Sequence, residues 1–231
     1  MSCKYELHVH TSQGSACGWS TGAEMADYFK RLGYAGMVVT DHFDGGNTAI
    51  DFNQPWVNAV ESFCLGYEDA KRRGDEIELD VFFGFEYSFH GTEFLIYGLD
   101  KEWLINNPQI IKMSLKNALK YFRKAGAFII HAHPFREAPY IEMFRLLPDY
   151  TDAVEVYNVH NTDRHNERAG VYAMMFGLKE VGGGDVHGAD GQASGIDSPK
   201  RLHTIGEMIN LIRHCDYKII KPKIYSSYFT K

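Results

Sequence analysis

Short apolar runs alternate with longer amphipathic stretches along most of the chain. The apolar runs predict seven strands: Tyr5–His10, Gly36–His42, Val81–Tyr87, Phe94–Leu99, Ala127–His133, Ala153–Val159 and Glu180–Asp185. The amphipathic stretches predict six helices: Thr21–Leu32, Trp56–Arg73, Pro108–Lys124, Ile141–Leu147, Thr162–Phe176 and Thr204–His214. Thr21 followed by Glu24 has the spacing of a capping box, which supports a helix start at that point.

Strands that alternate with helices indicate a mostly parallel sheet covered by helices. This number of elements fits an α/β barrel better than a short open sheet, although composition cannot separate the two. Repeats, low-complexity tracts and Pro/Ser-rich linkers are absent from the sequence, so we expect residues 1–231 to form a single domain.

Acidic and histidine side chains follow the predicted strands at their carboxyl ends, which is where parallel α/β folds bind ligands. They are His8, His10, Asp41, His42, Glu86, His131, His133, Asp185 and His187. In the pair His8 and His10, strand alternation places both imidazoles on one face, where they suit a divalent metal. The alternative is a pair of histidines satisfied by other hydrogen bonds. His131 and His133 repeat the pattern, and Pro134 ends their strand.

The segment 84–98 contains two apolar arms around the turn-like residues SFHGT and predicts a hairpin. Such a hairpin brings Glu86 close to Glu93, and two close carboxylates repel each other unless a cation lies between them. Alternatively, Glu86 pairs with a Lys or Arg, and Glu93 faces solvent.

Most other residues near the strand ends have more than one interpretation. Asp41 can accept a hydrogen bond from a metal-binding histidine. Arg136 is either a clamp for a phosphoryl oxygen or a surface ion pair. His160 is a ligand, a proton donor or a loop residue. The segment Asp44–Trp56 is a lid, a specificity loop or a plain surface loop, and Gly182–Gly184 forms either a surface turn or a tight approach to a site.

Bulk properties narrow the class of protein. The 231 residues are 45% hydrophobic, which suffices for a sizeable core. The net charge of −6 argues against nucleic acid as a partner but allows a small phosphorylated ligand. Four scattered cysteines indicate a reducing compartment. Without a signal-like or membrane-spanning apolar run, we expect a cytoplasmic protein with no membrane partner. The oligomeric state is not predicted.

The ordered motifs HVHT, VVTDH, GFE, HPF and GGGDVH resemble those of the PHP (polymerase and histidinol phosphatase) family. The resemblance runs from about His8 to Gly195, and the order of the motifs is more specific than any one of them. It implies a distorted seven-stranded (β/α) barrel with two or three divalent metals. Manganese, iron or zinc is expected, with magnesium as a further option.

Carried over by motif, the resemblance implies that His8, His10, Glu86 and Asp185 hold the first metal. Glu86 would bridge to a second metal with His133, and His42 and His187 would hold a third. Glu93 stands where family members often have a histidine, and its harder oxygen favours manganese, iron or magnesium over zinc. Cys17 is the nearest candidate for a further ligand of the third metal.

The expected activity is hydrolysis of a small phosphate ester by a metal-activated hydroxide, with histidinol phosphate, nucleotides and sugar phosphates as candidate substrates. Arg136 would offset charge on the phosphoryl oxygens, and His160 or His131 would act as general acid. Two other functions stay open: a metal-binding regulatory module without activity, and a metal-dependent amidohydrolase.

Overall fold

The structure is a computed structural model and describes residues 2–222. Its strands form one sheet in the order β7-β6-β5-β4-β3-β2-β1-β8-β9. The strands are β1 Cys3–Val9, β2 Gly36–Val39, β3 Asp80–Phe89, β4 Thr92–Tyr97, β5 Phe128–Ala132, β6 Ala153–Asn158, β7 Lys179–Gly183, β8 Ile196–Ser198 and β9 Lys218–Ile219. The helices are α1 Gly22–Arg31, α2 Trp56–Ile77, α3 Lys101–Ile105, α4 Leu115–Lys124, α5 Asp163–Phe176 and α6 Ile205–His214, with 3₁₀ turns at Pro108–Lys112 and Pro148–Tyr150.

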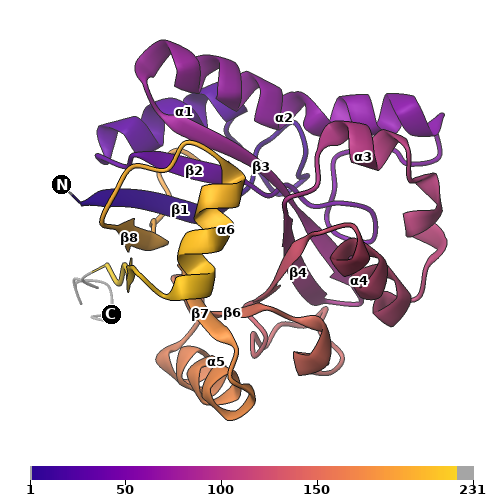
Figure 1. Ribbon diagram of the computed structural model, residues 1–231. Helices are drawn as coiled ribbons and strands as arrows, with labels where there is room; N and C mark the ends of the chain where they lie inside the picture. Colours follow the sequence, from indigo (N-terminus) through magenta and orange to yellow (C-terminus); the bar gives the residue numbers. More distant parts are fainter. Residues whose placement is uncertain (1, 223–231) are drawn as a thin grey trace, which may run out of the picture.

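The sheet curls into a nearly closed barrel because the chain after β7 returns to β1. Val186 donates from its backbone N–H to the carbonyl of His8 at 3.0 Å, and its own carbonyl accepts from His10 N–H at 2.9 Å. Helices α1, α2, α4 and α5 lie around the outside of the strands (Figure 1). None of the helices within residues 2–222 is both long and apolar enough to cross a bilayer.

All seven predicted strands are present, but the expected count of seven is wrong for the sheet as a whole. β8 and β9 add two short antiparallel strands beyond β1. Three and two residues are too few to produce a periodic pattern in the sequence. The predicted hairpin is present: β3 and β4 are antiparallel, and the turn between them places His90 and Gly91 at positive φ.

The helix predictions hold with two exceptions. The capping box at α1 is confirmed, since the side chains and backbone N–H groups of Thr21 and Glu24 bond reciprocally. The predicted helix Ile141–Leu147 is wrong: these residues are irregular, and none of their side chains is buried. A helix of this length depends on burying one face, and this segment has no such face. The predicted helix Pro108–Lys124 is interrupted at Met113, whose backbone is extended.

The apolar core fills one end of the barrel and leaves the other to polar groups. Tyr5, Leu7, Tyr97 and Ile130 are buried there with side chains of the other strands. Helix α6 packs against this cluster and lies across the ring of strands (Figure 1). The carboxyl ends of β1, β3 and β7 therefore open at the end of the barrel away from α6.

Candidate metal centre

A local irregularity in β1 directs two histidines into the barrel. The register between β1 and β2 shifts between Glu6 and Val9. The carboxylate of Glu6 lies in this bulge and accepts hydrogen bonds from the backbone N–H of His8 at 3.2 Å and of Gly184 at 2.6 Å. Beyond the bulge, His8 and His10 are fully buried, and their Nε2 atoms lie 3.0 Å apart. The two imidazoles therefore share one face, as their spacing predicts.

Glu86 lies at the centre of the polar end of the barrel. Nε2 of His8 and Nε2 of His133 lie 3.3 and 3.4 Å from its Oε1 atom. Nδ1 of His42 lies 2.7 Å from its Oε2 atom, but the two groups are not aligned for a hydrogen bond. Both carboxylate oxygens are buried without a hydrogen-bond partner among the described residues. Such an arrangement fits a carboxylate and imidazoles directed at shared cations.

Backbone pairing beyond β2 places His42 beside Glu86. The β2 strand ends at Val39, but the chain continues alongside β3: Glu86 N–H donates to Asp41 O at 3.0 Å, and Phe43 N–H donates to Glu86 O at 2.9 Å. The TDH motif thus lies next to Glu86, a proximity that the sequence did not predict.

Asp185 faces the same space from the segment after β7. Its Oδ1 atom lies 3.1 Å from Nε2 of His10 and 3.4 Å from Nε2 of His8. Asp185 has φ of +52°, a left-handed conformation that is uncommon outside glycine and that often marks functional positions. His187 bends back so that its Nδ1 atom lies 2.8 Å from the backbone carbonyl of Asp185.

The structure brings together all eight residues expected to bind metal. They form four overlapping groups, in each of which the ligand atoms lie within 4.8 Å of one another: His8–Glu86–His133, His8–His10–Asp185, His42–Glu86–Glu93 and His10–His42–His187. His8, His10, His42 and Glu86 each belong to two groups. Seven of the eight side chains are buried, and His187 is partly buried. The grouping differs from the expected one in three ways. Glu86 is not in the group of His8, His10 and Asp185, His42 also lies with Glu86 and Glu93, and His10 also lies with His42 and His187.

Three of the histidines use their two ring nitrogens in the same way: Nδ1 faces an oxygen that is not one of the ligand atoms, and Nε2 faces into the cluster. Nδ1 of His8 faces Glu155 at 3.1 Å, Nδ1 of His10 faces Ser15 at 3.0 Å, and Nδ1 of His187 faces a backbone carbonyl. A proton on Nδ1 satisfies each of these oxygens and leaves the lone pair of Nε2 directed inward. This is the division found in metal-binding histidines, whose second nitrogen is fixed by an outer hydrogen bond.

The electrostatics of the cluster are dominated by burial and opposite charge. Burial alone would raise the pKa of Glu86 and of Asp185, but the nearby histidines, and Arg136 beside Asp185, hold both pKa values well below the usual range. Burial and the charge of Glu86 raise the pKa of Glu93. Burial would lower the pKa of His8, yet the charges of Asp185 and the surrounding glutamates hold it well above its usual value. The centre therefore attracts positive charge.

Two networks outside the cluster were missed by the sequence analysis. Glu155 in β6 bonds to Nδ1 of His8 with one oxygen and accepts from His133 N–H and Asn158 Nδ2 with the other, both at 2.9 Å. An acidic residue within the apolar run AVEVYN was the only signal for it. The second network joins Ser15 to Asp41.

Ser15 connects the histidines to Asp41. Its hydroxyl lies 3.0 Å from Nδ1 of His10, accepts from His42 N–H at 3.0 Å, and donates to Asp41 Oδ1 at 2.7 Å. The other oxygen of Asp41 accepts from the hydroxyl of Thr11 at 2.7 Å. Asp41 therefore supports His10 through Ser15, instead of accepting directly from a histidine ring.

Arg136 belongs to the centre and is not a surface ion pair. Its guanidinium lies 2.6 Å from Oδ2 of Asp185 and donates to Asn158 Oδ1 at 3.0 Å, and its side chain is only 17% exposed. His160 is exposed at the edge of the site, within reach of the charges of Asp185 and Arg136.

The expectation that His131 can act as a general acid is not supported by its position. The ring is 1% exposed and stacks on Phe94 at 4.6 Å, with Tyr172 of α5 on another side. Burial, followed by the charge of His133, lowers its pKa to about 3. His131 therefore faces the outer side of the strands, whereas His133, with φ of +27°, turns into the centre.

An open cleft of about 560 Å³ leads to the cluster. Its lining includes Cys17, His42, Glu93, Arg136, Tyr140 and His187. Burial would raise the pKa of the Cys17 thiol, but its contacts with His187 and His42 lower it to about 6. Of the segment Asp44–Trp56, only Gly45, Gly46 and Asn47 line this cleft, while Phe52 packs inward on Phe43 at 4.9 Å.

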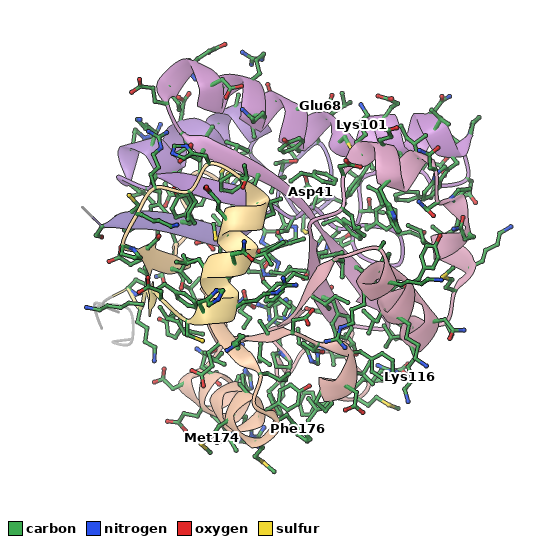
Figure 2. The ribbon with its side chains drawn as sticks, in the orientation of Figure 1. Asp41, Glu68, Lys101, Lys116, Met174 and Phe176 are labelled. Atoms are coloured by element: carbon green, nitrogen blue, oxygen red, sulfur yellow. The ribbon has the colours of Figure 1, made fainter. Side chains whose placement is uncertain are left out.

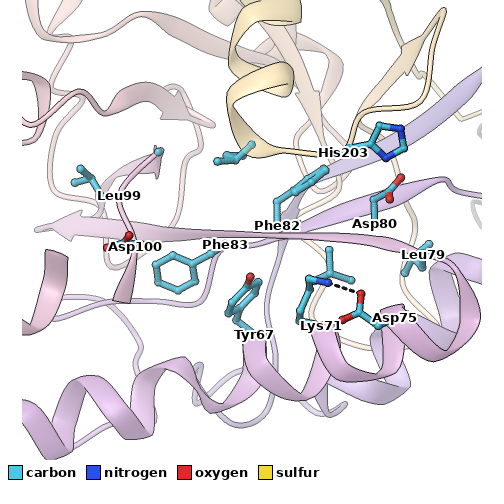
Figure 3. Close-up of a pocket in the computed structure, with 13 residues that line it drawn as sticks. Tyr67, Lys71, Asp75, Leu79, Asp80, Phe82, Phe83, Leu99, Asp100 and His203 are labelled. Carbon is cyan, nitrogen blue, oxygen red and sulfur yellow. Dashed lines mark hydrogen bonds and ion pairs between the residues drawn. The ribbon is translucent and has the colours of Figure 1, made fainter. Parts of the chain in front are cut away.

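A second hollow, of about 380 Å³, lies at the opposite end of the barrel between α2 and β3 (Figure 3). Tyr67, Phe82 and Phe83 contribute apolar walls, and Lys71 is paired with Asp75 of the same helix. Because Lys71 is neutralised by Asp75, the described lining of this hollow offers no unpaired lysine to a ligand. The side chains that could bind metal lie instead at the cleft near the carboxyl ends of the strands.

Comparison with known proteins gives a consistent fold at low sequence identity. No protein-family model matches the sequence, and no curated protein matches it. A two-domain protein from Bacteroides vulgatus, described as containing a predicted PHP-like metal-dependent phosphoesterase, superposes with a TM-score of 0.71 at 14% identity over 95% of this chain. The chain shares the fold of this PHP-like protein. It spans 64% of the length of the Bacteroides protein.

Two further structures resemble the chain along nearly their whole length. A putative metal-dependent phosphoesterase from Bifidobacterium adolescentis superposes with a TM-score of 0.58 at 16% identity, covering 91% of this chain and 96% of that protein. An amidohydrolase from Chromobacterium violaceum, with bound sulfate and no metal, gives 0.58 at 14% identity, covering 91% of this chain and 97% of that protein. Of these two structures, one is thus described as a putative phosphoesterase and the other as an amidohydrolase.

Proposed function

We propose that the protein is a PHP-family phosphoesterase that hydrolyses a small phosphate ester with the help of two or three divalent metals. The observation that carries this proposal is the convergence of eight histidine and carboxylate side chains, among them Glu86, whose oxygens have no hydrogen-bond partner among the described residues. A buried ionised carboxylate is costly unless a cation or hydrogen bonds compensate it. Bound cations would provide that compensation.

The residues fit a cluster of ions that share ligands. His8, His10, Glu86 and Asp185 would hold one ion, and Glu86 would bridge to a second ion bound by His133 and Glu93. His42 and His187 would hold a third, with Cys17 at its edge. When bound, divalent ions activate water as a nucleophile at neutral pH and offset charge on a phosphoryl group. The mixture of imidazole and carboxylate favours manganese or iron.

Two residues would act on the substrate directly. Arg136 is held between Asp185 and Asn158 and lines the cleft, which prepares its guanidinium to bind a phosphoryl oxygen and to stabilise the charge that grows there. His160, at the exposed edge of the site, would donate a proton to the leaving oxygen. With His131 buried elsewhere, His160 is the candidate general acid.

The Chromobacterium structure makes amide hydrolysis the second candidate. The same metal centre would activate water for attack on a carbonyl carbon. The position of Arg136 favours the phosphoesterase, because a guanidinium next to the cluster suits a dianionic phosphate better than a neutral amide.

A paired screen tests the proposal. The protein loaded with manganese, iron, zinc or magnesium is assayed for phosphate release from amino-alcohol, nucleotide and sugar phosphates, and for hydrolysis of amides and lactams. Phosphate release that is lost in Glu86→Gln supports the phosphoesterase. Amide hydrolysis without phosphate release would replace it with an amidohydrolase, and the absence of both reactions would favour a module without activity.

A further inference from the structure

Trp19 is a large aromatic residue that is exposed and yet held in place. Its side chain is 63% exposed. Its backbone N–H donates to the carbonyl of His187 at 2.9 Å, and its indole N–H donates to Asp190 at 3.1 Å. The indole also lies directly on Gly188, where an added Cβ atom would approach Nε1 to 1.8 Å. The fold therefore reserves space for this ring while leaving much of it in solvent.

The ring lies beside the metal centre. The imidazoles of His10 and His187 stack with centroids 4.3 Å apart and an interplanar angle of 19°. The indole of Trp19 continues this series, 6.2 Å from His187 at 20°. Three nearly parallel rings thus lead from the buried cluster to the surface, and His187 and Cys17 also line the cleft.

We propose that the indole of Trp19 is the binding platform for a planar aromatic ring carried by the phosphate ester. This inference rests on the proposed phosphoesterase function. With the phosphoryl group at the cluster and Arg136, the organic part of the substrate would leave past His187, which lines the cleft and lies against the indole of Trp19. An aromatic ring attached close to the phosphate can then stack on the indole, an interaction open to any planar ring.

The lining of the cleft, which includes His187 but not Trp19 itself, offers one further aromatic side chain. Tyr140, 58% exposed, lines the cleft together with Arg136. Asp190 uses one carboxylate oxygen to fix the indole edge. The aromatic surface therefore favours aryl or heterocyclic phosphates over acyclic ones.

Steady-state kinetics of the metal-loaded protein on phenyl phosphate and glycerol phosphate test the platform. Trp19→Ala should raise the KM for phenyl phosphate by about 10-fold, a typical loss for one stacked ring, and leave the KM for glycerol phosphate nearly unchanged. Trp19→Phe should retain most of the preference, and Gly188→Ala should lose it because the new methyl group displaces the indole. The matched control is Phe176→Ala, which removes an exposed aromatic ring from α5 (Figure 2). Equal effects of Trp19→Ala on the two esters, or no effect on either, would overturn the platform.

A binding measurement separates this inference from the proposed function. Phenylphosphonate and methylphosphonate are titrated calorimetrically into the metal-loaded protein and into Trp19→Ala. The platform predicts that phenylphosphonate binds about 10-fold more tightly than methylphosphonate and that Trp19→Ala abolishes this difference. Equal affinities in the unaltered protein would contradict the platform. If the preference is present but no ester is hydrolysed, the platform stands and the proposed reaction fails.

Discussion

Nδ1 of His42 lies 2.7 Å from Oε2 of Glu86 without forming a hydrogen bond to it. The same carboxylate has His8 and His133 on its other oxygen, at distances too long for strong hydrogen bonds. Despite complete burial, the surrounding histidines hold the pKa of Glu86 well below its usual range, so the carboxylate keeps its charge. Imidazole and carboxylate groups that converge in this way are best satisfied by cations between them.

Replacing Glu86 by Gln keeps the shape of the side chain and removes the charge that the ions share. We expect kcat to fall by at least about 100-fold, because losing even an outer partner of a metal ligand costs 10- to 100-fold. The comparison is with Glu137→Gln, which neutralises a side chain that is 52% exposed. Unchanged turnover in Glu86→Gln would exclude this residue from the centre.

Ser15→Ala should weaken metal binding without unfolding the protein. The hydroxyl bonds to the ring of His10, accepts from the backbone N–H of His42 and donates to Asp41. Because it orients both histidines, its loss should lower metal affinity roughly 10- to 100-fold. Affinity is measured by competition with a chelator. Ser198→Ala removes another buried hydroxyl, in β8, and controls for general destabilisation. Equal metal affinity in the two variants would show that Ser15 has only a structural role.

Arg136→Ala should act on substrate binding more than on metal content. Removing one charge-assisted contact costs about 1.5–3 kcal/mol, so the KM should rise roughly 10- to 100-fold. Arg136→Lys should recover only part of this loss, since a lysine cannot bind two oxygens with a planar fork. Arg164→Ala, at a side chain that is 67% exposed, is the control. A KM that stays the same in Arg136→Ala would contradict the clamp.

His131 should make the protein sensitive to acid. Its folded pKa is lowered to about 3 by burial and by the charge of His133, below the ordinary value of 6.5 in the unfolded chain. The folded state therefore binds fewer protons than the unfolded state between these values. Stability is fully present above about pH 6.5 and is lost as the pH falls toward 3, at up to about 1.4 kcal/mol per pH unit.

Chemical denaturation between pH 7 and pH 4 measures this dependence. His131→Phe removes the titrating group and keeps an aromatic ring between Phe94 and Tyr172. The variant should lose less stability on acidification than the unaltered protein. If the free energy of unfolding falls equally with pH in the two proteins, His131 is not held neutral by the fold.

The sequence pattern was sufficient for the main strands and for the convergence of the ligands. Strand ends such as those after β1 and β3 meet in any closed parallel barrel, so ordered His and Glu residues at these ends predict one site. The pattern failed where geometry departs from regular alternation. His131 and His133 are spaced to share a face, but the positive φ of His133 sends the two rings to opposite sides.

The supporting residues were not predictable for a different reason. Glu155 acts on His8 of a different strand, and Ser15 joins His10 to Asp41 in the segment after β2. The sequence around Glu155 and Ser15 carries no trace of these two pairings. In the same way, the bulge of β1 depends on the contact of Glu6 with the backbone of Gly184. Such long-range contacts exist only after the barrel has closed.

Elemental analysis of the purified protein tests the central claim most directly. The protein is incubated in turn with manganese, iron, zinc and magnesium, freed of excess ions and measured for bound metal per chain, with Glu86→Gln treated in parallel. The four overlapping ligand groups predict two or three ions per chain for at least one metal, and fewer in the variant. Less than one ion per chain with every metal, or equal loading of Glu86→Gln, would contradict the account.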